Sequence, residues 1–597
     1  MDADIVCVGF GPAMGGFLTT LSRELQRASG STSLESMAAP GLPLQVMCYE
    51  RADDVAFGVS GVVTRARAIS DSFPGVDLAQ IPMAARVSEE RVIYLGDPLG
   101  ASRRPRWMRL ADGAVRKLNR VRGSQAHAIE LPWTPSFLHK QGGLTFSLGQ
   151  FNQWVANQVL STGTVQIWPG TPVASAVIEQ NRVAGVRLLD QGGPGMEVRA
   201  QLTVVGDGPV GPVGRQLDEQ FGMPDGHHQR EWAVGMKMVV DLAPESQLRP
   251  GTVWHTIGFP EPEIFGFLYV HPDRVASVGI FVPSWFDSPV RTAYRYLQHW
   301  MLHPYIWPHL KGGRLRSWGA KTLGESGRQG EPFLVGDGYA RIGESSGCTN
   351  VLTGSGVDEA WLTGVQLGEG VIELLRAKRP FTRRNLEDTY VQRRRRSWVE
   401  AESMVAAHAR DGFQKGVLRG FLGMALAGMS GGKLTLRGEI RRPQDRLNGL
   451  EEFFKGRIPA AELRTMRERC SVEGKSLHGA LMEMCGWPAI PYDGQLLVSH
   501  QDALLMGGKV QAAPGGEDHV VFLRPELCEV CGARTCVEIC SGQAITATAS
   551  GRPTFDREKC IHCGACLWSC AQSLEEGSER TNIAFRAGAG GLHSAEN

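Results

Sequence analysis

The chain has 597 residues, with 63 basic and 62 acidic side chains and a formal net charge of +1. This length predicts two to four domains with ample core, and the near-neutral balance gives no indication of nucleic-acid binding. Of the 13 cysteines, five are scattered and the rest are grouped near the C-terminus, which is typical of a reducing compartment. No transmembrane helix is expected because no run of 18 apolar residues occurs, and no leader peptide is expected because a strand begins by Asp4.

The N-terminal stretch has the order of a dinucleotide-binding unit. Residues 4–9 are typical of a buried parallel strand, and a glycine turn and a helical stretch follow. Gly9 is predicted to make the turn, and Gly11 to let the backbone approach a pyrophosphate at the helix N-terminus. Met14 takes the third glycine position of the fingerprint, which leaves the helix–strand packing open. Taken alone, this partial match in a glycine-rich chain is compatible with an ordinary turn.

A second apolar strand, over residues 44–50, ends in an acidic residue. Glu50 takes the place of a ribose-binding carboxylate, and we predict that it and the adjacent Arg51 contact a cofactor. The acid comes later than usual, because residues 28–43 have the composition of a surface insertion. The alternative for Glu50 is a solvated turn residue.

Two more glycine turns follow strands further along the chain. Residues 202–205 are a short apolar strand before Asp207, and the turn resembles the second glycine–aspartate turn of flavin hydroxylase-type folds. A short strand ending at Gly343 precedes Glu344, which in flavoproteins of this type would bind the ribityl chain. Asp337 is the rival for that role.

Beyond Glu344, Asn350 and Gly354 lead into a helix from residue 357, whose positive end would stabilise negative charge on a reduced isoalloxazine. Each turn alone could be a surface turn. Three of them in this order predict FAD.

The middle of the chain combines a second sheet with a membrane-contacting segment. Residues 81–150 and 216–330 fall between the flavin turns, where this fold class inserts a sheet over the flavin. Residues 420–429 are apolar all round and too short to span a bilayer, and cations flank them on both sides. This pattern predicts a segment in the membrane interface, and the alternative is a core helix.

Eight cysteines form two runs between positions 528 and 570, and the second run has the spacing of bacterial ferredoxins. In that pattern three cysteines of one run hold a cubane and the fourth reaches the other cluster. The ligands predicted for one [4Fe–4S] cluster are Cys540, Cys560, Cys563 and Cys566. Those predicted for a second are Cys528, Cys531, Cys536 and Cys570, with four residues rather than two between Cys531 and Cys536. A disulfide framework and a zinc site are the alternatives.

Several stretches together resemble the electron-transfer flavoprotein–quinone oxidoreductases and the related FixC-type proteins. The resemblance is most specific at residues 255–260, which are similar to the family's His-Thr-Val-Gly-Trp-Pro, and at residues 560–566. Ser60 and Gly61, residues 149–154, 232–237, 266–269 and 319–323 also fit. The family has a single cluster, whereas the two cysteine runs look more like a FixX-type ferredoxin fused to its flavoprotein.

The resemblance implies an α/β fold: a Rossmann-like FAD-binding domain of the glutathione-reductase/hydroxylase type over residues 1–380, with an inserted β-rich quinone domain. A helical connector with the membrane-interface segment would cover 381–495, and an α+β ferredoxin-like domain 496–597. The tail after about residue 585 is expected to be disordered. The quinone site is expected at Gly258, Phe259, Phe265 and Gly266. The alternative is that these residues only pack a sheet.

The implied function is a monotopic oxidoreductase that takes electrons from an electron-transfer flavoprotein and passes them through [4Fe–4S] and FAD to a membrane quinone, with no catalytic side chain required. It would lie on the cytoplasmic face of an inner membrane, or on the matrix face in a mitochondrion. The rivals are the quinone branch of a bifurcating FixABCX-like complex, a geranylgeranyl reductase-type flavoenzyme, and an electron-carrying scaffold without its own substrate.

Overall fold

The computed structural model describes most of the chain in ten segments. These are residues 2–28, 34–56, 61–123, 126–189, 195–288, 292–473, 475–506, 518–548, 550–575 and 578–586. Ser60, part of the sequence resemblance, and the tail from residue 587 onward lie outside them.

An eight-stranded sheet forms the first half of the molecule. Its strands β18-β11-β1-β2-β8 are parallel, and β17 pairs antiparallel with β18 at one edge. Its strands are β1 (Asp2–Val8), β2 (Val46–Tyr49), β8 (Gln166–Trp168), β9 (Val173–Glu179), β10 (Arg182–Leu188), β11 (Glu197–Val205), β17 (Val335–Gly336) and β18 (Tyr339–Arg341). Residues 5–8 of β1 are almost completely buried, as expected of a strand covered on both faces. Val8 pairs with Tyr49 on one side and Val205 on the other, so two of the glycine turns meet at one edge.

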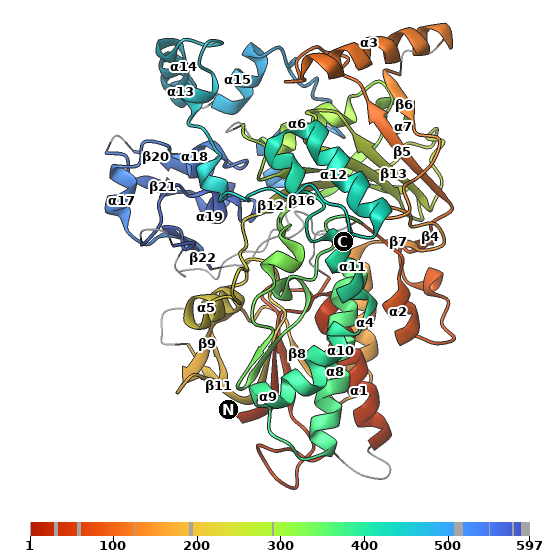
Figure 1. Cartoon of the computed structure of the whole chain (residues 1–597), viewed down its shortest axis with the longest axis vertical. Coiled ribbons are helices and arrows are strands. Elements are labelled where there is room, and N and C mark those ends of the chain that lie inside the picture. The colour runs from red at the N-terminus through yellow and green to blue at the C-terminus, as the bar shows by residue number, and fades with distance from the viewer. Residues whose placement is uncertain are drawn as a thin grey trace.

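Helices α1 (Pro12–Ala28), α4 (Leu148–Leu160) and α8 (Val357–Arg376) pack beside this sheet (Figure 1). Glycines let α1 and α8 approach closely: a Cβ at Gly364 would lie 1.8 Å from the carbonyl oxygen of Ala13. A Cβ at Gly16 would lie 2.4 Å from the carbonyl oxygen of Trp361. Met14, at the third glycine position of the fingerprint, is fully buried. The close approach that a glycine there usually allows occurs instead between α1 and α8, at Gly16 and Gly364.

The second half is a seven-stranded sheet in the order β16-β12-β15-β14-β13-β5-β6. Its strands are β5 (Glu89–Leu95), β6 (Ala128–Glu130), β12 (Trp232–Asp241), β13 (Thr252–Ile257), β14 (Phe265–Val270), β15 (Val275–Pro283) and β16 (Arg314–Gly324). Helix α6 (Ala293–Met301) covers one face, where Trp300 donates to Thr256 of β13. The other face lies toward the first half, because Nζ of Lys237 donates to the carbonyl of Gly61.

A small sheet joins the two halves. It consists of β3 (Val62–Thr64), β7 (Leu144–Phe146) and β4 (Ala85–Arg86). Val63 of this sheet shares an apolar cluster with Phe267 and Tyr269 of the seven-stranded sheet.

Helices dominate residues 383–505. They are α9 (Arg383–Leu386), the π-helical turn η4 (Glu387–Val391), α10 (Gln392–Arg395), α11 (Trp398–Ala406), the 3₁₀ turn η5 (Asp411–Lys415), α12 (Val417–Ser430), α13 (Leu450–Phe453), α14 (Ala460–Glu473), α15 (Leu477–Met484) and α16 (His500–Leu505).

The cysteine-rich segment folds into a small lobe, drawn in blue beside β12 and β16 in Figure 1. It contains β19 (Val520–Phe522) paired with β22 (Ile583–Phe585), β20 (Ile545–Ala547) paired with β21 (Pro553–Phe555), and the short helices α17 (Pro525–Glu529), α18 (Thr535–Glu538) and α19 (Ala565–Ser569). Its buried residues, such as Ile561 and Leu567, belong to the same apolar core as the seven-stranded sheet.

Candidate functional site

The first glycine turn has the shape that a dinucleotide requires. Gly9 has a φ of +82°, and a Cβ there would lie 2.9 Å from the carbonyl oxygen of Gly206, so this position favours glycine. At Gly11 no heavy atom of the described residues lies within 4 Å of an added Cβ. Glu50 faces this turn, since its carboxylate accepts hydrogen bonds from the amides of Phe10 (2.7 Å) and Ala52 (3.0 Å).

The second turn carries Asp207, whose Oδ2 accepts from the amides of Val213 (2.9 Å) and Gly214 (3.0 Å). These amides open helix α5 (Pro212–Phe221), so the carboxylate also caps a helix. Burial raises the pKa of Asp207 to about 6. Its buried Oδ1 has no hydrogen-bond partner among the described residues.

The third turn brings Glu344 under the seven-stranded sheet. Gly343 has a φ of +66°, and a Cβ there would lie 2.8 Å from Cβ of Ala13, so the turn approaches the start of α1. One oxygen of Glu344 pairs with Lys321 of β16. Its other oxygen is buried and has no hydrogen-bond partner within the described segments. The rival Asp337 is an exposed turn residue that accepts from the amide of Arg383.

Residues 350–356 connect this turn to α8. Asn350 uses its side-chain oxygen within the loop, accepting from the amides of Leu352 and Thr353, both at 3.1 Å. Gly354 has a φ of +61° and, like Gly11, open space where a Cβ would lie. Two open glycine positions and two orphaned carboxylate oxygens, on Asp207 and Glu344, are features that fit FAD along this edge. The individual contacts of these residues and of Arg51 with a cofactor stay predictions.

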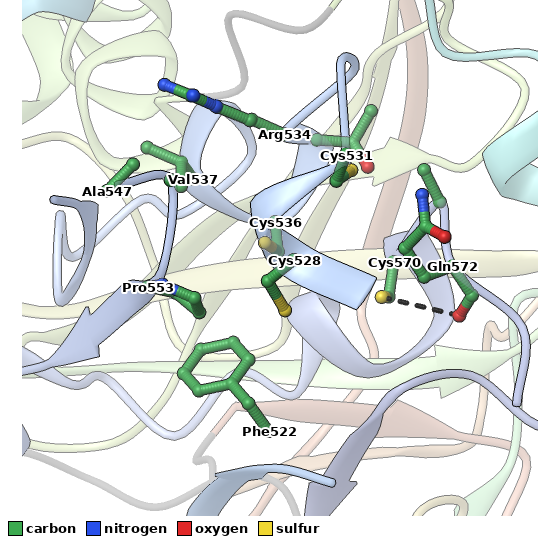
Figure 2. Close-up of a pocket in the computed structure, with 13 residues that line it drawn as sticks. Phe522, Cys528, Cys531, Arg534, Cys536, Val537, Ala547, Pro553, Cys570 and Gln572 are labelled. Atoms are coloured by element: carbon green, nitrogen blue, oxygen red, sulfur yellow. Dashed lines mark hydrogen bonds between the residues drawn. The ribbon is translucent and has the colours of Figure 1, made fainter. Parts of the chain in front are cut away.

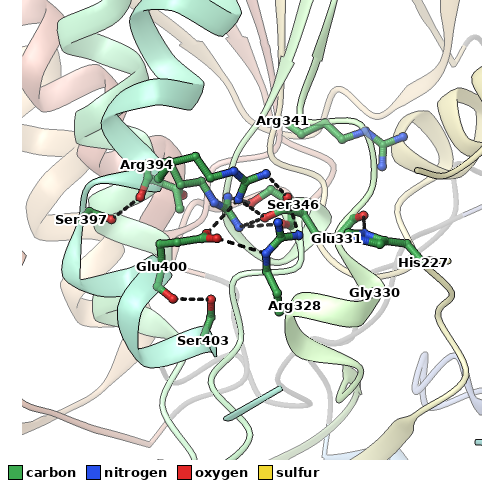
Figure 3. A network of polar contacts seen from close by, with 12 residues as sticks. His227, Arg328, Gly330, Glu331, Arg341, Ser346, Arg394, Ser397, Glu400 and Ser403 are labelled. Atoms are coloured by element: carbon green, nitrogen blue, oxygen red, sulfur yellow. Dashed lines mark hydrogen bonds and ion pairs between the residues drawn. The ribbon is translucent and has the colours of Figure 1, made fainter. Parts of the chain in front are cut away.

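A network of buried charges holds this edge in place (Figure 3). Glu331 is 2% exposed and pairs with Arg328 (3.1 Å), Arg394 (3.2 Å) and Arg395. Arg394 in turn donates to the hydroxyl (2.7 Å) and the carbonyl (2.9 Å) of Ser346, two residues after Glu344. Burial opposes ionisation of Glu331, but the arginines outweigh it and keep its pKa below the ordinary value. The third turn is therefore fixed to the helices that carry the arginines.

Strand registers show which side chains face the flavin half. One row across the sheet pairs Lys237 with Gly279, Gly279 with Phe267, and Phe267 with His255. Residues paired across a sheet share a face, so these side chains lie on the side where Lys237 reaches Gly61. Burial, aided by the neighbouring Lys321, lowers the pKa of Lys237 to about 7. Lys237 and Lys321 are not among the site residues predicted from the sequence, although a lone lysine in an apolar strand is a signal for Lys237.

The four residues predicted for a quinone have different neighbours, and their role stays a prediction. Phe265 contacts Phe413 and Phe421, with ring centroids 6.3 and 6.1 Å apart, and so links the sheet to α12. Phe259 is 1% exposed and packs on His303 and Trp487, away from that contact. An added Cβ at Gly266 would meet Trp300, on the face that α6 covers. At Gly258 it would lie 2.7 Å from the carbonyl oxygen of Leu95, which indicates a packing role.

Helix α12 buries small residues and exposes large ones. Gly420, Gly423 and Ala427 face the protein, whereas Leu418, Leu422 and Met429 are 60%, 51% and 81% exposed. Exposed side chains of Lys415, Arg419, Lys433, Arg437 and Arg441 flank it. An ordinary core helix buries its large apolar residues, so this surface has the character of an interaction site. Among the described residues no helix combines the length and hydropathy that a bilayer crossing requires.

The predicted ligand sets are called here the first thiol group (Cys540, Cys560, Cys563 and Cys566) and the second thiol group (Cys528, Cys531, Cys536 and Cys570). The thiols interact within each group and also between them, since Cys536 acts on Cys566 and Cys540 on Cys536, so the division into two ligand sets stays a prediction. Burial has the largest effect on the Cys566 thiol and raises its pKa, and the charges of Cys563, Cys560 and Cys540 raise it further. Burial likewise raises the pKa of the Cys536 thiol, and the charges of Cys570, Cys531 and Cys528 raise it further. Thiols crowded in this way suit a metal cluster, because coordinated iron relieves the repulsion between thiolates. The sulfur atoms of each group would be the ligands.

The two groups differ in exposure. In the first group Cys560, Cys563 and Cys566 are each 9% exposed; Cys563 and Cys566 lie in the core shared with the sheet, as does Cys570 of the second group. The second group surrounds a pocket whose wall Phe522, Pro553 and Ala547 complete (Figure 2). Three of its four members are only half-buried.

Strand β16 separates the first thiol group from the third glycine turn. The amide of Thr322 donates to the carbonyl of Cys563 (2.8 Å), and the indole of Trp568 donates to the Thr322 hydroxyl (3.2 Å). The preceding residue, Lys321, points to the opposite face and pairs with Glu344. One strand thus contacts both candidate cofactor sites.

Comparisons with known proteins agree with this arrangement. A family model described as "ETF-QO, ubiquinone-binding" matches residues 232–323, which are the strands β12 to β16. The electron transfer flavoprotein-ubiquinone oxidoreductase of Pseudomonas aeruginosa is 27% identical over 396 residues, covering 64% of this chain and 65% of that protein. The mitochondrial protein of that name from Dictyostelium discoideum is 25% identical over 450 residues, covering 71% and 67%.

A solved structure of a geranylgeranyl bacteriochlorophyll reductase-like protein from Thermoplasma acidophilum has a TM-score of 0.50 at 13% identity, covering 74% of this chain and 94% of that one. This likeness concerns the fold alone. The predicted FAD-binding type of mixed α/β fold is confirmed, whereas the ferredoxin-like assignment of the lobe and the predicted domain boundaries stay predictions.

Proposed function

We propose, from the premise that this chain belongs to the electron transfer flavoprotein–ubiquinone oxidoreductase family, that it is an oxidoreductase that carries electrons from an electron-transfer flavoprotein to a membrane quinone. The matched region spans only about two thirds of the first relative's length, 65%, so activity, substrate and partner belong to the proposal. FAD and [4Fe–4S] clusters would supply the one- and two-electron chemistry, and the protein would position them.

The proposal rests mainly on β16, which contacts both the thiol lobe and the third glycine turn. The Thr322 amide binds the Cys563 carbonyl at the free edge of β16, and the Thr322 hydroxyl binds Trp568 of the lobe. The Lys321 side chain binds Glu344 on the opposite face. A cluster held by the first thiol group and a flavin at the third glycine turn would therefore be separated by one strand, and neighbouring sheets or strands are only ~5–10 Å apart. Electrons can cross such a distance without a further relay.

The membrane end of the route would lie at α12. Its exposed leucines and methionine would enter the headgroup region, and the flanking cations would bind anionic lipid. Phe421 of this helix contacts Phe265 of the sheet, which offers an apolar quinone a path to the flavin-facing side. The contact with the membrane would be peripheral, on the side from which the donor flavoprotein also approaches.

The test is a reconstitution. Purified protein with FAD, iron and sulfide should pass electrons from a reduced electron-transfer flavoprotein to a soluble quinone analogue, and should float with vesicles of anionic lipid. Leu422→Glu should lose flotation while it keeps activity toward the soluble analogue. Absence of quinone reduction by fully loaded protein would reject the proposed function.

The second thiol group favours one alternative, the quinone branch of a bifurcating FixABCX-like complex. Its four cysteines surround a pocket of their own and are not needed for the single-cluster route. Reduction of ferredoxin or flavodoxin by NADH, in the presence of this protein, its partner flavoprotein and quinone, would separate the alternatives. Without that reaction, the simple route to quinone is the better description.

A further inference from the structure

Three side chains lie in a line from the surface inward on the flavin-facing side of the seven-stranded sheet: His255 and Glu90 share a hydrogen bond, and His139 lies at ion-pair distance from Glu90. Nδ1 of His139 lies 3.1 Å from Oε2 of Glu90, and Oε1 of Glu90 lies 3.1 Å from Nε2 of His255. His139 has a side chain that is 49% exposed, and the Glu90 side chain is 2% exposed. The line thus begins in solvent and passes through a buried carboxyl group.

Its inner end lies on the face described above as turned toward the flavin half. His255 pairs in register with Phe267, and Phe267 with Gly279, which pairs with Lys237. The His255 side chain keeps 16% of its surface accessible. Its other ring nitrogen, Nδ1, has no hydrogen-bond partner among the residues that the structure describes.

A neighbouring contact ties the line to the predicted flavin loop. The amide of Lys140 donates to Oε2 of Glu90 (2.8 Å), and the buried ammonium of Lys140 donates to the carbonyl of Thr353 (3.0 Å), beside Gly354. Burial opposes ionisation of Glu90, yet the hydrogen bonds from His255 and from the Lys140 amide outweigh it and hold its pKa below the ordinary value. The carboxylate is therefore available as a proton acceptor between two imidazoles.

We propose that His139, Glu90 and His255 form a proton relay from solvent to the redox centre under the sheet. The proposal rests on the proposed function, because reduction of a quinone to a quinol takes up two electrons and two protons. The donor flavoprotein supplies the electrons, and water supplies the protons. The line runs along the flavin-facing side of the sheet, because Glu90 pairs with Val253 and so shares a face with His255. It begins in solvent at His139.

The proton transfers balance at named atoms. The Glu90 carboxylate first takes a proton at Oε2 from Nδ1 of protonated His139, which is recharged from solvent, and rotation of the carboxyl group brings that proton to His255. As the acceptor takes the proton from Nδ1 of His255, in the tautomer that carries it there, Nε2 of the ring takes the proton from the Glu90 carboxyl group, which becomes a carboxylate again. Rotation of the ring and of the carboxyl group restores the starting tautomers.

The experiment uses fully loaded protein and three variants. Glu90→Gln keeps the shape but cannot take up a proton, and His139→Asn removes the solvent end while it leaves the buried part intact. His309→Asn is the matched control, because His309 packs on Trp254 of the same strand but on the opposite face. Iron, sulfide and FAD contents are measured first, so that only loaded protein is compared.

Two readouts are recorded by stopped flow. One is proton uptake, followed with a pH-indicator dye after photoreduction without quinone, and the other is quinone reduction. We expect Glu90→Gln to slow both at least tenfold, within the range for positioned acid–base groups. His139→Asn should slow both less, and added imidazole should restore His139→Asn but not Glu90→Gln. His309→Asn should match the parent protein.

These readouts separate the two proposals. Parent protein that fails to reduce quinone, but whose proton uptake depends on Glu90 and His139, retains the relay and loses the proposed function. Proton uptake and quinone reduction at parental rates in both Glu90→Gln and His139→Asn overturn the relay. If Glu90→Gln does not fold, the rate of His139→Asn with and without imidazole decides.

Discussion

The flavin half and the thiol lobe achieve stability in different ways. The flavin half has two apolar clusters of its own, and its helices α1 and α8 pack at contact distances that only glycine allows. The lobe has no separate cluster among its described residues, and each of its strands has only three residues. A region this small usually needs a metal or a partner surface to hold its fold.

The two regions therefore differ in what they need to keep their fold. The flavin half should keep its fold whether or not a cofactor is present, because its packing does not depend on one. The lobe should depend on its thiols, and the first thiol group should matter more than the second because three of its four thiols are buried, whereas three of the four in the second group are half-buried.

The largest effect is expected from Cys563→Ala. Loss of one ligand removes the cluster next to β16, so transfer from donor flavoprotein to quinone should fall to background while FAD stays bound. Turnover, FAD absorbance and iron content measure this. Cys485→Ala, a half-buried thiol outside both groups, is the control and should keep its activity.

Unchanged turnover in Cys563→Ala would contradict the role of the first thiol group. Loss of bound FAD in the same variant would show that the two regions are not independent. Either result would contradict the contrast between the flavin half and the thiol lobe.

Cys531→Ala tests the second group. Its thiol lines the pocket of Figure 2, so iron should fall from about eight to about four per chain, with one cluster signal retained in electron paramagnetic resonance. Transfer to quinone should persist at a reduced rate if the second cluster only feeds the first. Loss of all iron would mean that the two groups fold as one unit.

Much of the candidate site was predictable because the sequence carries local signals for it. Gly9, Gly11 and Gly343 follow apolar strands, and parallel strands end at one edge of a sheet, so their convergence follows from topology. The cysteine runs predicted that the eight thiols lie near one another in a small lobe, and the structure shows them interacting there; their division into two ligand sets stays a prediction. Both signals depend on neighbours in sequence or on a repeated spacing.

Contacts across strands left no such signal. Lys321 and Glu344 meet because β16 lies over the third turn, and Glu90 meets His255 because β5 is parallel to β13. The sequence also could not show that Phe259 turns into the helical side of the sheet, since an aromatic residue after a glycine turn fits either face. Pairing of distant strands, set by the whole fold, decided these points.

Glu331→Gln should destabilise the flavin half and spare the lobe. The substitution leaves Arg394, which is 2% exposed, as a buried charge without its carboxylate, a change that typically costs about 3–5 kcal/mol. Thermal unfolding followed by FAD fluorescence measures the loss. Glu387→Gln removes an exposed pair with Arg383 and should change little. Equal effects of the two variants would argue against a buried network.

Glu231, at the start of β12, should make stability depend on pH. Burial and the nearby Asp411 raise its pKa to about 8, so the folded protein holds a proton that the unfolded chain releases above pH ~4.5. Stability should therefore fall as pH rises from about 5 to 8. Glu231→Gln removes that loss, and its melting temperature should exceed the parent's by an amount that grows over this range. A difference that is constant with pH would contradict the assignment.

The smallest effect concerns the contact between lobe and sheet. Trp568→Phe removes one hydrogen bond to the Thr322 hydroxyl, worth about 1 kcal/mol, and Thr322→Val removes the same bond from the other side. Because the backbone bond from Thr322 to Cys563 persists in both, the lobe should stay docked and keep its iron. A double-mutant cycle on thermal stability should give a coupling of about 1 kcal/mol. Loss of iron in either variant would mean that this side-chain contact, rather than the backbone bond, holds the first thiol group against β16.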